Sequence, residues 1–145
     1  VMETQSSGRR PFSGAIAQLK AAGLRPTRQR IALAKLLFEG SNRHVTAEEL
    51  HDEARGAGVS VSLATVYNAL HQFTDAGLMR EVVVEAGRSY FDTNTGDHHH
   101  FFHEDTGTLD DIPSTEISLA TLPAAPEGTS VRRVDVIVRV SSSGR

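Results

Sequence analysis

The chain changes its hydrophobic pattern once, from helical spacing to strand alternation. Four stretches repeat apolar residues at helical spacing, and each ends at or near a glycine: residues 13–22, 28–39, 47–55 and 63–75. Beyond residue 78 the apolar residues alternate, which predicts two strands over 78–84 and 89–92 joined by a turn. Short helices followed by a two-stranded ribbon predict a winged helix-turn-helix.

Hydroxyl residues indicate where three of these helices begin. Thr27 and Ser62 stand at N-cap positions of the second and fourth helices. Thr46 is followed three residues later by Glu49, which forms the pattern of a capping box and opens the third helix. In a winged helix the third helix crosses the DNA backbone and the fourth enters the major groove.

The exposed side of the fourth predicted helix carries groups that can bond to phosphates and base edges. Thr65, Tyr67 and Asn68 lie there. Simple solvation would also explain a polar face. However, residues 1–46 hold eight Lys or Arg, including Arg28 and Arg30, against two Glu, a net charge of +6. Together the element order and this charge favour DNA binding by the first half of the chain.

The second half is acidic and contains Asp-His-His-His-Phe-Phe-His at residues 97–103, with four of the seven histidines. If this stretch is a strand, His98 and His100 share one face, and His99 and His103 share the other. Neutral imidazole and neighbouring carboxylates suit zinc, iron or manganese, and without cysteine there is no soft site. A histidine-rich exposed loop is the alternative, but the interleaved phenylalanines favour a ligand strand.

Further elements complete an α+β fold in the second half. The pattern predicts a hairpin partner at 108–112, a short helix at 115–122 and a final strand at 131–140. We therefore expect a winged-helix DNA-binding domain at 1–92, a hinge at 93–97 and a small α/β metal-binding dimerisation domain at 98–145. About fifty residues bury too little core alone, so we expect a homodimer or a higher oligomer, which would present two winged helices to a palindromic operator.

Composition excludes several other classes. No stretch has the length and hydropathy of a membrane span, and no signal-peptide hydrophobic region follows the N-terminal polar residues, so we expect a cytoplasmic protein without a membrane partner. The absence of cysteine excludes disulfides, cysteine zinc sites and a thiol nucleophile.

Several motifs together resemble the ferric uptake regulator (Fur) family of bacterial metal-responsive repressors, over residues 19–140. They are Ala-Gly-Leu-Arg-Pro-Thr-Arg-Gln-Arg at 22–30, His-Val-Thr-Ala-Glu-Glu-Leu at 44–50, Leu-Ala-Thr-Val-Tyr at 63–67, Asp-Ala-Gly at 75–77 and the histidine run before Gly107. Within the family the chain looks most like the iron response regulator (Irr) subgroup, whose members carry a His-His-His run and respond to haem.

The resemblance implies a sensing site made from both sides of the hinge. Its ligands would be His44, Asp92, His98, His100 and Asp111. One ion bound by all of them would fix the angle between the two DNA-binding domains of a dimer.

The resemblance also implies a possible second metal or haem site and a DNA contact. Asp97, His99 and Glu116 match parts of the second site, although Val134 stands near the position of its fourth ligand, a histidine. The family's structural zinc knot is missing, because His103 and Thr106 occupy the places of its first cysteine pair. Haem would therefore have to bind through histidine. Arg25 matches a residue that reaches into an A/T-rich minor groove.

Three classes of function then compete. The first is a dimeric transcription regulator of iron homeostasis, which binds an A/T-rich inverted repeat under the control of haem, a divalent metal (manganese, iron or zinc) or both. Its variant is a manganese-, iron- or zinc-responsive repressor with no haem role. The second is a metallohydrolase, but no His-Glu-x-x-His motif accompanies the histidines, so we expect no enzyme activity. The third is an architectural DNA-binding protein, which would be indifferent to chelator and haem.

Overall fold

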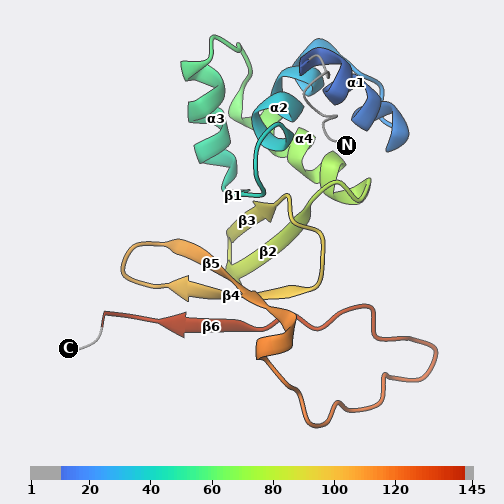
Figure 1. The fold of residues 1–145 in the computed structure, drawn as a ribbon, viewed down its shortest axis with the longest axis vertical. Helices are drawn as coiled ribbons and strands as arrows, with labels where there is room; N and C mark the ends of the chain where they lie inside the picture. The colour runs from blue at the N-terminus through green and yellow to red at the C-terminus, as the bar shows by residue number, and fades with distance from the viewer. Residues whose placement is uncertain (1–10, 143–145) are drawn as a thin grey trace, which may run out of the picture. The chain divides into compact units, whose positions relative to one another are not determined.

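The computed structural model describes residues 11–142 and divides the chain between Thr95 and Gly96 into two compact units, which we call unit 1 and unit 2 (Figure 1). The boundary falls inside the segment expected as the hinge, residues 93–97. The mixture of helices and sheets confirms the predicted α+β class. None of the described helices is long and apolar enough to cross a membrane.

Four helices form most of unit 1. They are α1 (Pro11–Ala21), α2 (Arg28–Phe38), α3 (Ala47–Gly56) and α4 (Leu63–Asp75). The predicted caps are confirmed: the Thr27 hydroxyl accepts from the Arg30 N–H at 3.2 Å, and the Ser62 hydroxyl from the Thr65 N–H at 3.0 Å. Thr46 and Glu49 form the complete capping box at the start of α3.

The apolar stripes of the four helices meet in one core. Its fully buried large side chains include Leu19, Leu33, Leu37, Leu50, Leu70 and Phe73. Burying a side chain of this size contributes about 1.5–3 kcal/mol each, so the core fixes α4 against α2 and α3. The opposite side of α4 is left exposed, which is what a recognition helix requires.

The wing of unit 1 contains one strand more than the sequence predicted. Strands β2 (Arg80–Glu85) and β3 (Arg88–Asp92) form the expected hairpin, and β1 (His44–Val45) pairs with β3 to give the order β1-β3-β2. A strand of two residues is too short to show alternation, so sequence reasoning missed it. Its register places His44 opposite Asp92.

Unit 2 is built on a second three-stranded sheet. It contains β4 (His98–His103), β5 (Thr108–Pro113) and β6 (Ile137–Val140) in the order β5-β4-β6, with β4 antiparallel to β5 and parallel to β6. The histidine stretch is therefore a strand, as its alternation predicted.

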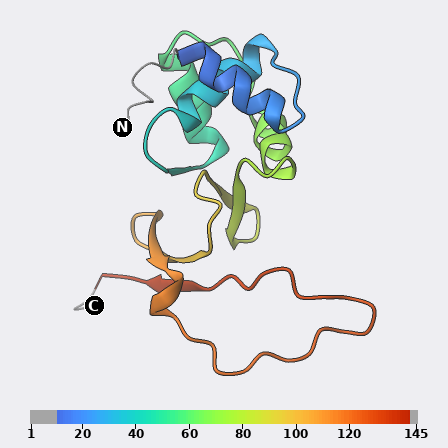
Figure 2. The same ribbon diagram turned by 45° about the vertical axis from the view of Figure 1, so that its right-hand side comes forward.

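The helix predicted over residues 115–122 is wrong. A single 3₁₀ turn, Ser114–Glu116, is followed by an irregular segment that continues to β6 (Figure 2). Thr115, Ile117 and Thr121 are β-branched and favour a helix poorly, and Pro123 follows them. The final strand is also shorter than the predicted 131–140, since β6 begins at Ile137, and the N–H of Val136 just before it donates to the His99 ring.

Candidate metal centre

One face of β4 presents two buried histidines to a carboxylate on β5. His98 is 5% exposed and His100 is 2% exposed. Alternation along the strand puts both on one face, and the register of the β4–β5 pair puts Asp111 opposite His100. The Nε2 atoms of His98 and His100 lie 3.7 and 3.5 Å from Oδ1 of Asp111.

These distances fit ligands of one ion better than hydrogen bonds. A charge-assisted N–H···O bond is normally 2.7–2.9 Å long, well short of 3.5 Å. Two ligand atoms each about 2.05 Å from one ion are about 2.9–3.6 Å apart when the angle between the two bonds is about 90–120°. The ligand atoms of the three residues all lie within 4.8 Å of one another, so one ion between them needs only small side-chain movements.

A backbone contact selects the metal-binding tautomer of His98. Its Nδ1 lies 2.6 Å from the carbonyl oxygen of Gly96, to which it donates. The proton of the neutral ring is then on Nδ1, which leaves the Nε2 lone pair toward Asp111. This is the usual arrangement of a histidine ligand, whose other nitrogen is held by an acceptor.

Unit 1 brings together the two other ligands that the resemblance implies. His44 and Asp92 are register partners of β1 and β3. Asp92 is only 1% exposed, and its Oδ1 accepts from the Asn94 N–H at 2.9 Å. The rings of His44 and Tyr90 are nearly perpendicular, with centroids 6.5 Å apart and planes at 89°. A short sheet therefore holds an imidazole and a buried carboxylate side by side in unit 1.

The residues of the possible second site belong to no metal cluster found among the described residues. Asp97 and Glu116 are exposed, and no group of three or more potential metal ligands in that part of the chain includes His99. Nδ1 of His99 accepts from the Val136 N–H at 3.1 Å, so the neutral ring carries its proton on Nε2. The second site stays a prediction.

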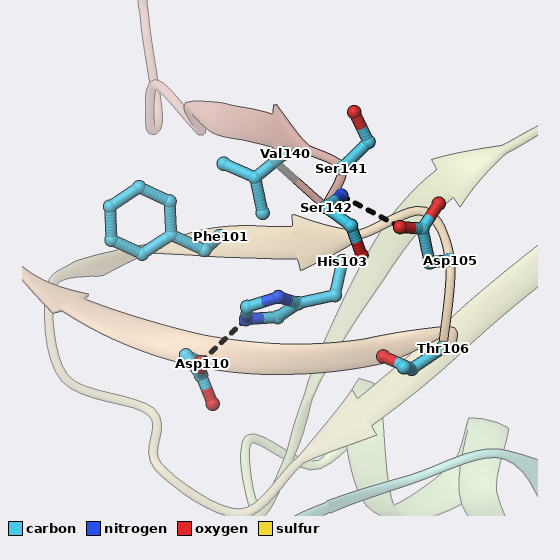
Figure 3. Close-up of a pocket in the computed structure, with 8 residues that line it drawn as sticks. All are labelled: Phe101, His103, Asp105, Thr106, Asp110, Val140, Ser141 and Ser142. Atoms are coloured by element: carbon cyan, nitrogen blue, oxygen red, sulfur yellow. Dashed lines mark hydrogen bonds and ion pairs between the residues drawn. The ribbon is translucent and has the colours of Figure 1, made fainter. Parts of the chain in front are cut away.

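The other face of β4 borders a hollow of about 480 Å³ (Figure 3). His103 Nε2 lies 2.7 Å from Asp110 Oδ2 there, and Asp105 accepts from the Ser142 N–H at 2.7 Å. Hydrogen bonding from the Ser142 side chain, and then from its backbone N–H, lowers the pKa of Asp105 below its usual value. Since His98 and His100 are on the opposite face of the strand, this hollow is separate from the candidate metal centre.

Four of the six predicted DNA-binding residues line a second, polar hollow of about 250 Å³ between α2 and α4. Arg25, Thr65 and Asn68 line it, as does Arg30. The Arg30 guanidinium donates to the Arg25 carbonyl at 3.0 Å and to Oε1 of Gln72 at 2.8 Å. Arg30 therefore joins the α1–α2 loop to α4, a role that its charge alone did not reveal. Arg28 is exposed in the first turn of α2 and does not line this hollow.

Tyr67, on the exposed face of α4, is held by a residue that sequence reasoning missed. Its hydroxyl donates to Glu48 of α3 at 2.9 Å, which raises the pKa of Tyr67. Its ring stacks on His71, with centroids 6.4 Å apart and planes at 20°. The spacing of 19 residues between Glu48 and Tyr67 gives no signal in the sequence, because the contact depends on how α3 packs on α4.

The fold and these residues define a winged-helix protein with a candidate metal centre in its second unit. The model of the ferric uptake regulator family matches residues 21–138, and the chain belongs to this family. The family resemblance drawn from the motifs is thereby confirmed.

Individual relatives agree with this assignment. The chain is 44% identical over 82 residues to the ferric uptake regulation protein of Shigella flexneri, covering 57% of this chain and 55% of that protein. It is 35% identical over 103 residues to the peroxide-responsive repressor PerR of Staphylococcus aureus, covering 71% and 69%. The solved ferric uptake regulator from Pseudomonas aeruginosa with manganese has a TM-score of 0.68 and 27% identity, covering 89% and 98%. The chain thus spans just over half the length of the first of these relatives.

Proposed function

We propose that this chain is a dimeric transcription regulator whose affinity for DNA is controlled by a divalent metal ion. The observation that carries the proposal is the buried pair His98 and His100 facing Asp111, with the spacing of ligands that share an ion. Burial removes the polar atoms of an imidazole from water, which is costly unless those atoms bind a partner, and a metal ion is one such partner. The proposed activity is binding, without catalysis.

In the proposed mechanism the ion also coordinates His44 and Asp92 of unit 1. Five ligands from the two sides of the hinge would restrict the motion of residues 93–97 and hold the winged helices of a dimer at one separation. An ion changes DNA affinity only if it binds one arrangement of the two winged helices more tightly than another. The coupling free energy between two such binding sites is typically about 1–3 kcal/mol. Imidazole with carboxylate suits zinc, iron or manganese.

A DNA-binding titration tests the proposal. Duplexes selected from a random pool by the Mn²⁺-loaded chain supply the probe, and we expect an A/T-rich inverted repeat among them. Its affinity is then measured by fluorescence anisotropy with chelator alone, Mn²⁺, Fe²⁺ or Zn²⁺. We expect at least one ion to change the affinity by about 5–150-fold. Equal affinity in every sample would favour an architectural DNA-binding protein instead.

The haem response implied by the Irr-like histidine run remains a prediction with no supporting contact among the described residues. Nε2 of the neutral His99 ring carries a proton while Nδ1 accepts from Val136, so haem would have to break that contact. We call the ion proposed to bind His44, Asp92, His98, His100 and Asp111 the hinge metal. We expect His99→Ala to bind as many hinge metal ions per chain as the wild type. Haem absorbance spectra of this variant and of the wild type test whether His99 binds haem. A spectrum of nitrogen-ligated haem in the wild type that is lost in the variant supports haem binding by His99, and identical spectra show that His99 is not a haem ligand.

The exposed apolar residues of unit 2 support the proposed dimer. Among its described residues the buried apolar side chains are Phe102, Leu109 and Ile112, whereas Leu119, Leu122 and Val131 are 48–55% exposed. A unit of this size gains stability by covering such residues with a second copy. Light scattering at micromolar concentration should give the mass of a dimer or larger without DNA or metal, and a stable monomer would contradict the proposal.

A further inference from the structure

Two short chain segments that flank the proposed ligands of unit 1 are locked together. The N–H of Arg43 donates to the Thr93 hydroxyl at 2.9 Å, and the N–H of Thr93 donates to the Arg43 carbonyl at 2.9 Å. These bonds continue the β1–β3 ladder, in which His44 is opposite Asp92. The two ligands therefore move as one piece, which we call the ligand ribbon (residues 43–45 and 91–93).

One side chain ties the ligand ribbon to the helices. The Arg43 guanidinium forms a two-pronged ion pair with the Glu53 carboxylate, through Nη1–Oε1 at 2.9 Å and a second contact between Nη2 and Oε2. Its Nη1 also donates to the Leu36 carbonyl in the last turn of α2, at 3.2 Å. The Arg43 and Glu53 side chains are only 34% and 37% exposed, so the pair is partly shielded from solvent.

Glu53 lies on α3, which packs against α4, the proposed recognition helix. Leu50 of α3 is fully buried in the same core as Val66 and Leu70 of α4. Glu48 of α3 accepts from Tyr67 of α4, as described above. A continuous set of contacts thus runs from the ligand ribbon through Arg43 to α3, and from α3 to the face of α4 proposed to read DNA.

We infer that Arg43 and Glu53 are positioning residues that couple the ligands His44 and Asp92 to the recognition helix. The inference rests on the proposed function, because it assigns the route by which the hinge metal changes DNA affinity. Neither residue binds metal or DNA in this scheme. Their role is to make the ligand ribbon and α3 move together, and arginine suits it because its planar fork fixes the direction of the carboxylate.

The test uses the full chain, Mn²⁺ and the selected duplex. Arg43→Gln and Glu53→Gln each remove the ion pair, and Arg55→Gln is the matched control. Arg55 pairs with Asp52 on the same helix at 3.4 Å, but their side chains are 69% and 72% exposed and do not reach the ribbon. Arg43→Gln and the control remove the same charge, so a general loss of attraction for phosphates affects both alike.

We expect the Mn²⁺-dependent ratio of DNA affinities to fall from about 5–150-fold in the wild type to about 1–3-fold in Arg43→Gln and Glu53→Gln, with the control unchanged. Because coupling is reciprocal, the effect of DNA on Mn²⁺ affinity should fall by the same factor, while the Mn²⁺ affinity of the DNA-free chain stays near that of the wild type. The double variant should have about the same ratio as Arg43→Gln alone, since Arg43 takes part in both the ion pair with Glu53 and the bond to Leu36.

A purely structural role would lower the thermal midpoint and leave the Mn²⁺-dependent ratio intact, which would overturn the inference. So would an equal loss of the ratio in Arg55→Gln. If Arg43→Gln does not fold, the nearly isosteric Glu53→Gln decides alone. If Mn²⁺ does not change the DNA affinity of the wild type, the proposed function and this inference are both wrong. If the Mn²⁺-dependent ratio is lost only in Arg43→Gln and Glu53→Gln, both are supported.

Discussion

Replacing His98 and His100 together by alanine should abolish the metal-dependent change in DNA affinity and leave the dimer intact. Both rings are buried on one face of β4 and point their Nε2 atoms toward Asp111. Losing even an outer partner of a metal ligand typically costs 10–100-fold in metal affinity, so losing two ligands should cost at least about 100-fold. Metal stoichiometry, DNA anisotropy and light scattering on the same sample measure the three properties.

His103→Ala is the matched control for the double variant. It removes an imidazole from the same strand, but from the opposite face, where His103 is paired with Asp110 (Figure 3). The control should keep the hinge metal and the response to it. Equal losses in the double variant and in His103→Ala would mean that the two faces of β4 do not act separately, and the proposed site would be wrong.

Replacing Arg25 by alanine should weaken binding to the selected duplex by about 1–3 kcal/mol and relax the preference for A/T near each half-site. Arg25 lies at the polar hollow beside Thr65 and Asn68, and Arg30 holds its carbonyl at 3.0 Å. A narrow A/T-rich minor groove concentrates negative potential, so an arginine placed there contributes sequence preference as well as charge. Anisotropy titrations against A/T-rich and G/C-substituted duplexes measure both effects.

Lys35→Ala controls for the loss of one positive charge. Lys35 lies in the last turn of α2, whereas the hollow is lined by residues from the beginning of that helix. The Lys35→Ala variant should bind the A/T-rich duplex and the G/C-substituted duplex more weakly by the same small factor. If Arg25→Ala gives the same result as Lys35→Ala, the proposed minor-groove contact is wrong.

Local signals in the sequence predicted most of the fold. Thr27, Thr46 and Ser62 predicted the beginnings of three helices, because a cap depends only on residues a few positions away. Alternation predicted β4 and the common face of His98 and His100 for the same reason. The helix expected over residues 115–122 was wrong, because a weak apolar pattern there is opposed by β-branched residues.

Contacts between distant residues could not be predicted in this way. Glu48 and Tyr67 are 19 residues apart, and Arg43 meets both Glu53 and Thr93. Each contact depends on how whole elements pack, and a charged or hydroxyl side chain on a short strand or helix has no pattern that names its partner. The candidate ligands could be predicted from the sequence because imidazole and carboxylate are distinctive ligand groups. The side chains that link these ligands to the helices could not be predicted.

We propose that one ion coordinates residues of both units. Crystals of the full chain grown with Zn²⁺ and measured at the zinc absorption edge test it directly. The account predicts an anomalous peak about 2.0–2.2 Å from ligand atoms of His98, His100 and Asp111 and also from His44 and Asp92. A peak bound only by unit 2 residues, with His44 and Asp92 out of reach of the ion, would contradict it.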